Sequence, residues 1–452
     1  MATTYIHRTP ASTGSNTVWT MSMWFKRKKV DTAHCLWNNG SSTQTQIQIG
    51  SDNQIVLYNG ATTVFKTPAR VYDTMSWSHI VVAVDTGESG TDKVKCYLNG
   101  LQITTFESDN RSTASAFNNV NVSGEEMDIG STGSGSYFDG CMSHVNFIDG
   151  TQYAATAFGS YNATDGIWEI NTSPTVTYGT NGYFLKMEDS SNLDLDSGTN
   201  AFTFTTVGEL SRTKDTPSNS FCALNPLYPY GSGVNVTNDG GTSFVGTQGN
   251  ANRMVAGDKM ITSGKYYYEV KINTVSANNE YTIGWRSNWN LFNGTWADAM
   301  GSGGIAPSYG LQKDGDLNYS TNAAYNQTDS GWTTYTTGDI ICCAIDLDNN
   351  FMYWGKDGTW MKSGDPTSGS TGTGGFAFVS GYSWFPAAAS TEGSSGSTVY
   401  MSFNFGNGTF ANVSGAPSVV TSAGTNASDN GIFEFDVPTG YGAICTKQIN
   451  GD

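Results

Sequence analysis

Residues 338–360 read GDIICCAIDLDNNFMYWGKDGTW. The apolar run 340–347 and the segment 351–355 predict two strands, because β-branched and aromatic residues suit a pleated, half-buried surface. Between them, residues 348–350 (Asp-Asn-Asn) are types that tolerate a left-handed backbone, and a Lys-Asp-Gly turn follows at 356–358. The stretch therefore predicts a β-hairpin.

This hairpin pattern resembles the central hairpin of SPRY (B30.2-like) domains. Further blocks of that family's pattern occur in its order: GKYYYEV (264–270), YTIGW (281–285), SYGLQKDGDL (308–317), WFPAAA (384–389) and VYMSFNFG (399–406). The resemblance covers roughly the last half of the chain. It implies a SPRY-like β-sandwich with a C-terminal extension over residues 231–452, and an unrelated sandwich with similar hairpins is the alternative.

The first half of the chain consists of short segments that alternate apolar and polar residues. They are TVWTMSMWFKRKK (17–29), TQIQIGSDNQIVLYNG (45–60), WSHIVVAVDT (77–86), KVKCYLNGLQITTF (93–106), EMDIGS (126–131) and YFDGCMSHVNFIDG (137–150). Gly, Asn or Asp bounds each segment, and no long amphipathic helix is indicated. This pattern is typical of a β-sandwich.

The order of TMSMWFK, WSHIVVAVD, VKCYLNG, DIG and YFDGCMSHVNF resembles the laminin-G-like, concanavalin A-like jelly roll. The resemblance covers about residues 15–150. It implies a jelly roll over residues 1–210, in which 151–210 add further strands that complete the sandwich. The predicted fold class is all-β, with two sandwiches in tandem.

A boundary is predicted at residues 211–230. Three of the 11 prolines of the chain lie there among polar residues, and proline removes a donor from a strand ladder. The string DTPSNSFCALNPL (215–227) resembles the junction before the SPRY-like domain in structural proteins of tailed bacteriophages. The string FDVPTGYGAICTKQIN (435–450) resembles the end of the same group.

Composition excludes several classes of protein. A net charge of -17 argues against nucleic acid and against docking on an anionic membrane by charge. No run of about 18 apolar residues predicts a membrane span, and the first residues show no signal-peptide pattern. The seven cysteines are scattered through apolar strand patterns, so we expect buried thiols made in a reducing compartment.

The closest approach to a catalytic motif is Glu126-x-Asp128. Glycosidases on jelly-roll folds place a Glu nucleophile, an Asp and a Glu acid on one face of a strand, with two carboxyls about 5 Å apart. Here Gly130 or Ser131 holds the third position, so the acid is missing and a structural strand is expected instead. No histidine has a partner at zinc-ligand spacing, and His79 and His144 are expected to be structural.

Aromatic residues in and beside the long loops are the candidate ligand-binding residues, because Trp, Tyr and Phe rings stack on the apolar faces of sugars. They are Trp289, Phe292, Trp296, Tyr309, Trp360, Tyr382 and Trp384. A minicore under the loop, or a subunit contact, is the structural alternative. No cofactor is expected, although Asp194 and Asp196 are candidate calcium ligands, with solvated turn acids as the alternative.

These resemblances together imply a non-enzymatic virion protein made in the host cytoplasm. The leading hypothesis is a tail-fibre or tail-tip adhesin that recognises host surface glycan or protein. The alternative is a capsid or tail decoration protein without a specific ligand. We expect a homo-oligomer that contacts other virion proteins, and neither nucleic acid nor membrane insertion.

Overall fold

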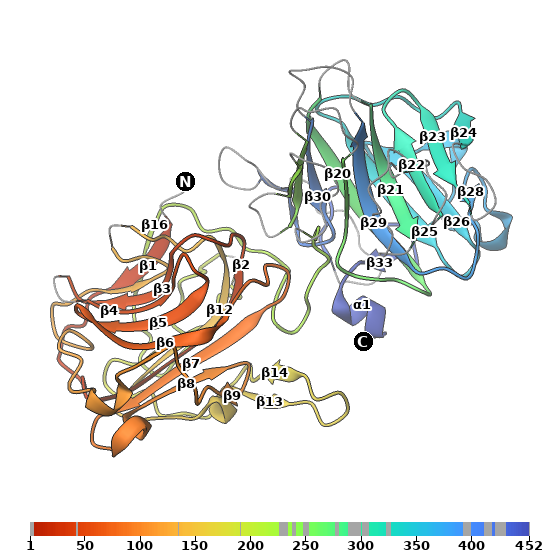
Figure 1. The fold of residues 1–452 in the computed structure, drawn as a ribbon. Coiled ribbons are helices and arrows are strands. Elements are labelled where there is room, and N and C mark those ends of the chain that lie inside the picture. The colour runs from red at the N-terminus through yellow and green to blue at the C-terminus, as the bar shows by residue number, and fades with distance from the viewer. Residues whose placement is uncertain are drawn as a thin grey trace. The chain divides into compact units, whose positions relative to one another are not determined.

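The chain is almost entirely β-structure, with one α-helix, α1 (Thr446–Asn450), in the part that the structure describes. It divides into two compact units, Met1–Arg212 with Thr216–Ser218, and Thr213–Asp215 with Asn219–Asp452 (Figure 1). No helix of the described part is long and apolar enough to cross a membrane. The computed structural model describes residues 4–41, 44–133, 135–189, 191–225, 234–236, 241–246, 253–275, 280–287, 300, 307–321, 327–391, 399–410, 418–420 and 431–451.

The first unit is built from two antiparallel sheets and a separate strand pair. The eight-stranded sheet has the order β10 (Ser108–Asp109), β6 (Thr62–Arg70), β5 (Gln54–Asn59), β4 (Thr45–Ile49), β3 (His34–Asn39), β11 (Met127–Ile129), β1 (Tyr5–Arg8) and β16 (Thr205–Val207). The six-stranded sheet has the order β15 (Tyr183–Leu185), β12 (Gly140–Asp149), β2 (Val18–Arg27), β7 (Ser78–Asp85), β8 (Val94–Leu98) and β9 (Leu101–Gln102). The pair consists of β13 (Gly159–Tyr161) and β14 (Trp168–Ile170), and short 3-10 turns cover Gly90–Lys93, Arg111–Thr113 and Ala155–Ala157.

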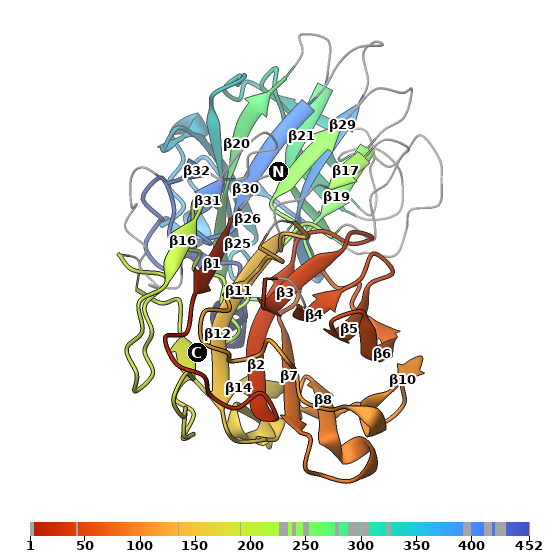
Figure 2. The ribbon, with the colours of Figure 1, turned by 90° about the vertical axis from the view of Figure 1, so that its left-hand side faces the viewer.

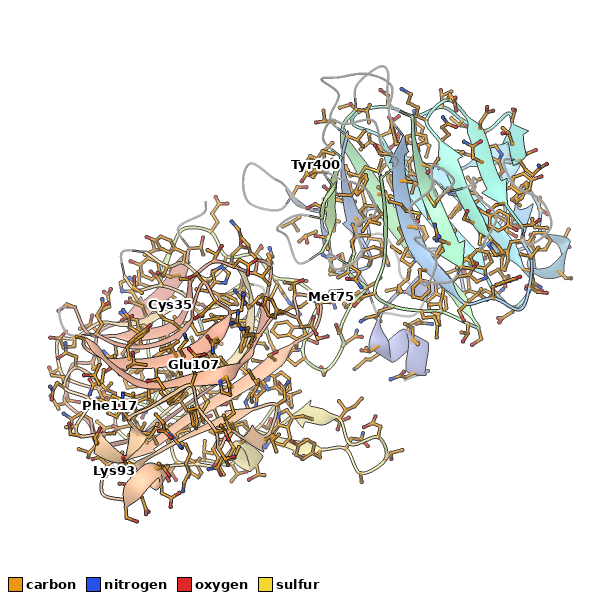
Figure 3. All side chains as sticks on the ribbon, in the orientation of Figure 1. Cys35, Met75, Lys93, Glu107, Phe117 and Tyr400 are labelled. Carbon is orange, nitrogen blue, oxygen red and sulfur yellow. The ribbon has the colours of Figure 1, made fainter. Side chains whose placement is uncertain are left out.

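The main core of this unit lies between its two sheets. Strand β2 contributes Trp19 and Met21, strand β3 contributes Trp37, and Phe117 enters from a loop (Figure 3). Alternate residues of a strand point to opposite faces, so the alternating segments each supply one apolar row to this core. The predicted segment 45–60 forms two strands, β4 and β5, joined by a turn at Asn53 with φ 65°.

Strand β7 is buried on both faces. Ile80, Val82 and Val84 face the main core, whereas Val81 and Ala83 face a second core on the other side of the six-stranded sheet. Residues 151–178, including β13 and β14, cover that outer side. This two-sided burial explains why the sequence of β7 is a continuous apolar run. The segment 151–210 thus forms an outer layer in addition to adding the edge strands β15 and β16.

The second unit also contains two facing sheets. The larger has the order β17 (Val234–Val236), β18 (Ser243–Gly246), β30 (Val399–Asn404), β20 (Lys265–Thr274), β25 (Ile340–Asp346), β26 (Phe351–Lys356) and β27 (Thr359–Trp360), with β28 (Phe376–Ala377) on β26 and β33 (Gly442–Ala443) parallel to β20. The smaller has the order β19 (Arg253–Ala256), β29 (Trp384–Thr391), β21 (Glu280–Ser287), β22 (Ser308–Gln312), β23 (Asp316–Ser320) and β24 (Gln327–Ser330). A further pair joins β31 (Thr409–Phe410) to β32 (Ser418–Val419), and 3-10 turns cover Met361–Ser363 and Gly369–Thr371.

The predicted hairpin is confirmed as β25 and β26, which lie in the larger sheet between β20 and β27. The Asp346 carboxylate anchors its turn by accepting the backbone N–H groups of Asp348 (3.1 Å) and Asn349 (3.0 Å), and it pairs with Lys265 Nζ at 2.9 Å. Asn350 adopts a φ of 63°. Both faces of β25 are buried, which explains its apolar run.

The middle part of the predicted linker 211–230 is packed into the second unit in the structure. Cys222 N–H donates to Ile444 O (2.8 Å) and Leu224 N–H to Gly241 O (2.6 Å), and both side chains are buried in the second unit. A segment outside the regular strands can be buried when its backbone N–H and C=O groups have hydrogen-bond partners, as they do here. Residues 219–225 are therefore part of the second sandwich. With each unit formed by two facing sheets, the predicted fold class of two β-sandwiches is confirmed.

Candidate functional site

Five side chains form a polar row across the outer face of the eight-stranded sheet. Their strand neighbours point into the main core, so these side chains point away from it. Figure 2 shows β16, β1, β11, β3 and β4 side by side. In the order β1, β11, β3, β4 and β5, the register aligns His7, Asp128, Asn38, Gln46 and Tyr58.

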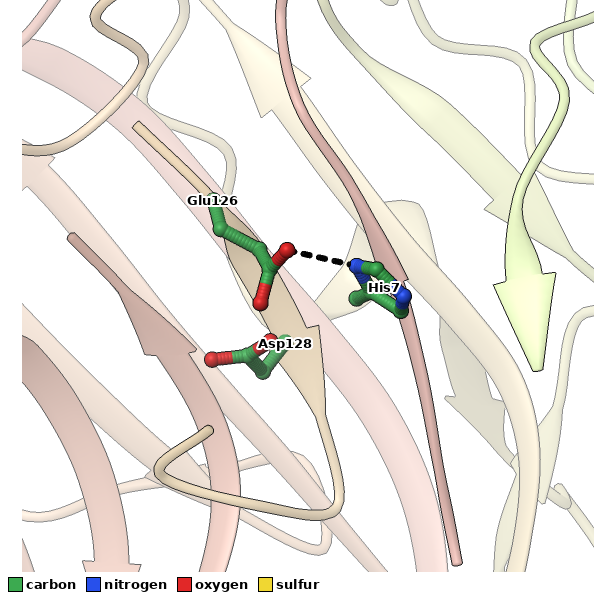
Figure 4. Close-up of side chains that lie close together, drawn as sticks. All are labelled: His7, Glu126 and Asp128. Carbon is green, nitrogen blue, oxygen red and sulfur yellow. Dashed lines mark hydrogen bonds and ion pairs between the residues drawn. The ribbon is translucent and has the colours of Figure 1, made fainter. Parts of the chain in front are cut away.

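Charged groups of the row lie close together where Glu126, just before β11, adds a second carboxylate. His7 Nδ1 lies 2.7 Å from Glu126 Oε2, and Asn38 Nδ2 donates to Asp128 Oδ2 at 2.7 Å. One ligand-type atom from each of His7, Glu126 and Asp128 lies within 4.8 Å of the other two. Figure 4 shows the two carboxylates and the imidazole ring gathered in one place. We call these three residues the His7 cluster.

The backbone holds Glu126 at this position. Its carbonyl oxygen accepts the N–H of Gly40 at 2.9 Å and the Nδ2 group of Asn39 at 2.9 Å. Asn39 is the last residue of β3, and Gly40 follows it directly. Glu126 is therefore held on β3, and because it precedes Asp128 by two residues its side chain emerges on the same face.

Burial and charge act together on these groups. Asp128 is 2% exposed, and its burial raises the pKa of its carboxyl group to about 7. The hydrogen bond from Asn38 acts to lower this pKa, whereas the neighbouring Glu126 carboxylate raises it further. The pKa of Tyr5 is also raised, mainly by burial and then by the carboxylates of Glu126 and Asp128. Burial and the neighbouring Glu126 carboxylate therefore both favour the protonated form of Asp128.

A loop after β11 covers part of the cluster. Gly130, with a φ of 87°, turns the chain, and its N–H donates to Leu36 O at 3.1 Å. The loop then passes close over Asp128, because a Cβ added at Gly133 would lie 3.3 Å from Asp128 Oδ2. Gly130 also occupies the third position of the glycosidase pattern, where a carboxylic acid would stand.

Sequence reasoning identified Glu126 and Asp128 as neighbours on one face, and the structure brings them together. It missed His7, which lies 119 residues from Glu126 in the chain. Spacing along one strand carries no information about a residue on another strand. The alternation in Tyr5-Ile6-His7-Arg8 was the available signal that His7 faces away from the core.

The structure brings only some of the predicted aromatic residues to a surface. Tyr309 is 1% exposed and Trp384 is 0% exposed, and their rings pack 5.6 Å apart in the core of the second unit. Trp360 is half-buried against Tyr267, and Tyr382 is half-buried against the same unit's core. Trp289, Phe292 and Trp296 lie outside the described residues.

The candidate calcium ligands have protein partners. Asp196 is 4% exposed and accepts the backbone N–H groups of Phe184 (2.9 Å), Gly198 (2.8 Å) and Phe202 (2.8 Å). Asp194 accepts the hydroxyl of Thr206 at 2.8 Å. These bonds give Asp196 a structural role in the turn before β16.

Comparisons with known proteins bear mainly on the first unit. A family model described as the concanavalin A-like lectin/glucanases superfamily matches residues 2–157, which confirms the concanavalin A-like prediction there. No curated protein matches the chain.

Several solved structures are similar in fold. They include the SPRY domain of human HERC1 (17% identity, 40% of this chain and 96% of that one, TM-score 0.30), a human SPRY domain (14%, 38% and 95%, 0.25) and a heptameric SAP-like pentraxin from Limulus polyphemus (14%, 34% and 72%, 0.26). At these scores the similarity says nothing about what either unit binds.

Proposed function

We propose that this protein is a non-enzymatic component of a tailed-phage virion, a tail-fibre or tail-tip adhesin that binds glycan or protein on the host surface. The two strings that resemble phage structural proteins carry the proposal. Resemblance of separate strings has more weight when they belong to one structural unit, since a unit folds and is inherited as a whole.

These two strings, more than 200 residues apart in the chain, pair with each other. Ser220 O accepts the N–H of Thr446 at 3.0 Å, and Ser220 N–H donates to the Thr446 hydroxyl at 3.1 Å. Phe221 and Cys445 form a β-bridge. Residues 219–225 and 435–450 both belong to the second unit, which supports a single shared domain as the source of both resemblances.

The absence of an acid at Gly130 supports a binding role for the first unit. Hydrolysis by the usual carboxylate pair needs a general acid beside the nucleophile, and Gly130 or Ser131, just after β11, holds that position. The matching family includes lectins as well as glucanases. A polar row that ends in Tyr58, with the Tyr5 ring 5.5 Å from His7 at its other end, suits sugar hydroxyls and the apolar faces of sugar rings.

The test is binding of fluorescently labelled full-length protein to a panel of bacterial strains, before and after periodate stripping of surface polysaccharide. We expect saturable binding to at least one strain, and its loss after stripping indicates a glycan. Trp289→Ala and Trp296→Ala should weaken binding, whereas Tyr72→Ala removes a 46% exposed ring outside the predicted site and should not.

Other outcomes would overturn the proposal in different ways. No binding to any strain at micromolar protein, with saturation of a fixed number of sites on purified phage particles, indicates a decoration protein. If the protein instead releases reducing sugar from host polysaccharide, and Glu126→Gln abolishes this release, the protein is an enzyme.

A further inference from the structure

We propose that two copies of this chain pair through strand β16 (Thr205–Val207), so that their eight-stranded sheets join edge to edge. The occupant of this sheet edge is therefore a second copy of the same chain. The purpose of the pairing, attachment to a host at two points, rests on the proposed function. The pairing itself does not, and it can be measured without any host cell.

Strand β16 is the last strand of the eight-stranded sheet. On one side it pairs with β1, in a register that places Val207 opposite Tyr5 and Thr205 opposite His7. Figure 2 shows β16 beside β1 at the end of the sheet. On its other side, no strand of the described part of the chain pairs with it. This edge can therefore offer its backbone N–H and C=O groups to another strand.

The edge lacks the devices that usually prevent such pairing. Proteins protect free sheet edges with charged side chains, proline or a bulge. The sequence of β16 is Thr-Thr-Val, without charge or proline, and its register with β1 is continuous. Strand β24, the last strand of the smaller sheet in the second unit, instead carries Asp329, which is paired with Lys362. An unprotected edge favours the addition of a strand.

Two exposed leucines lie near β16. Leu210 follows the strand by three residues and is 37% exposed. Leu195 is 44% exposed, and its neighbour Asp194 accepts the hydroxyl of Thr206 at 2.8 Å, which places this leucine beside the strand. Contact with a second chain would remove apolar surface of both leucines from water, which is favourable.

Charge and symmetry favour a second copy as the partner. A net charge of -17 makes two copies repel each other over most of their surface, whereas β16 places no charge at the contact. A strand that pairs antiparallel with its own copy forms a closed two-fold contact. With the axis at Thr206, Thr205 of one copy lies opposite Val207 of the other, and no like charges are brought together.

This arrangement has a consequence for binding. Two sheets that join edge to edge about a two-fold axis perpendicular to them keep their outer faces on the same side. The polar rows of both copies would therefore face the same way, and two weak contacts to one surface would act together. Strand β16 lies beyond residues 2–157, which match the family, so the family match does not include this edge.

The test is sedimentation velocity of the full-length protein over a range of about 1–100 µM, where a small interface is expected to dissociate. We expect monomers at the lowest concentration and dimers at the highest. Two charged-edge variants are compared with the wild type. One combines Thr205→Lys with Val207→Lys, and the other combines Thr205→Glu with Val207→Glu.

Each charged-edge variant alone should dimerise at least tenfold more weakly than the wild type, because like charges then meet across the axis. An equimolar mixture of the two should form dimers again, since opposite charges then face each other. Loss of folding cannot be restored by mixing, and near-UV circular dichroism verifies each variant. Leu101→Asp is the control, since it places a charge at a 71% exposed position on β9, the edge of the other sheet, and should dimerise as the wild type does.

Three results would overturn the pairing. They are a wild type that stays monomeric over the whole range, charged-edge variants that dimerise like the wild type, and a mixture that stays monomeric. Binding to host cells is a separate measurement. A monomer that binds cells would refute the pairing and leave the adhesin function standing, whereas a β16 dimer that binds no strain would do the reverse.

Discussion

His79 illustrates how single residues are determined by their surroundings. It is 0% exposed in β7, and Trp24 stacks on it at a centroid distance of 4.8 Å. Trp168 Nε1, which can only donate, lies 3.1 Å from His79 Nδ1, so Nδ1 accepts. The other ring nitrogen, Nε2, therefore carries the proton and donates to Ser22 Oγ at 2.9 Å. The ring is neutral.

A pH dependence follows from this neutral histidine. Burial lowers the pKa of His79 from 6.5 to about 3, so between these values the unfolded chain binds the extra proton and the folded chain does not. Its contribution to stability is full above pH 6.5 and is lost as pH falls toward 3, by about 2 kcal/mol at pH 5. We expect the difference in unfolding free energy between wild type and His79→Gln to shrink accordingly from pH 8 to pH 5.

Nitrogen NMR of the ring provides a direct measurement of the same property. The His79 signals should remain those of the neutral Nε2–H form from pH 8 down to pH 4.5. A titration with a midpoint near pH 6.5 would contradict this assignment.

At the scale of elements, the β25–β26 hairpin depends on one residue with a left-handed backbone. Asn350 has a φ of 63°, and its carbonyl accepts the N–H of Phe378 at 3.1 Å. A β-branched side chain is strained at this φ, whereas glycine is not. We therefore expect Asn350→Val to lower the free energy of unfolding by about 1–2 kcal/mol, and Asn350→Gly to change it by less than about 0.5 kcal/mol, in urea denaturation. Equal effects of the two substitutions would refute the argument.

A buried carboxylate attaches the C-terminal segment to β20. Glu269 accepts four hydrogen bonds, from the Tyr267 hydroxyl (3.0 Å), Asn404 Nδ2 (3.1 Å), and the N–H groups of Glu434 (2.9 Å) and Phe435 (2.9 Å). Each carboxylate oxygen receives two of them.

Replacing Glu269 by Gln tests this attachment. The amide nitrogen cannot accept, so two donors lose their partner, and we expect a loss of about 2–4 kcal/mol in unfolding free energy. Hydrogen exchange of the Glu434 and Phe435 amides should quicken. Glu107→Gln, which weakens the exposed pair with Lys66 and keeps one oxygen that can accept from Gln54 Nε2, should cost about 1 kcal/mol or less. A Glu269→Gln protein as stable as the Glu107→Gln control would show that the segment is held by other contacts.

At the scale of the whole molecule, each unit has its own core between its own sheets. In the first unit that core extends beyond the region of the family match, because Tyr183, Leu185 and Phe204 belong to it. Phe158 and Trp168 belong to the second core, outside the six-stranded sheet. The folding unit is therefore longer than the recognisable family pattern.

Truncation tests where the first unit ends. We expect residues 1–212 alone to fold cooperatively, with dispersed amide NMR signals. Residues 1–150 alone lack β15 and β16 and the outer layer, so they should expose the apolar outer face of β7 and aggregate or remain without fixed tertiary packing. A well-folded 1–150 fragment, or an unfolded 1–212 fragment, would contradict this boundary.

Several features could be read from local pattern. The turn residues around Asn350 and the two apolar runs determined the hairpin, because backbone preferences act within a few residues. The two-residue spacing of Glu126 and Asp128 placed them on one face for the same reason. For the aromatic residues the local pattern was insufficient, because the sequence around Tyr309 and Trp384 is compatible both with rings beside a loop and with rings in the core. Only the packing of the two sheets placed both rings in the core.

The sequence by itself thus determined an all-β chain of two sandwiches and the positions of most strands, because alternation and turn propensity are local properties. Only the tertiary structure decided which strands became neighbours. It aligned His7 with Asp128 and Asn38, and it joined residues 219–222 to the C-terminal segment. These contacts connect positions 90 to more than 200 residues apart, and pairing across such distances depends on sheet order, which no short stretch of sequence encodes.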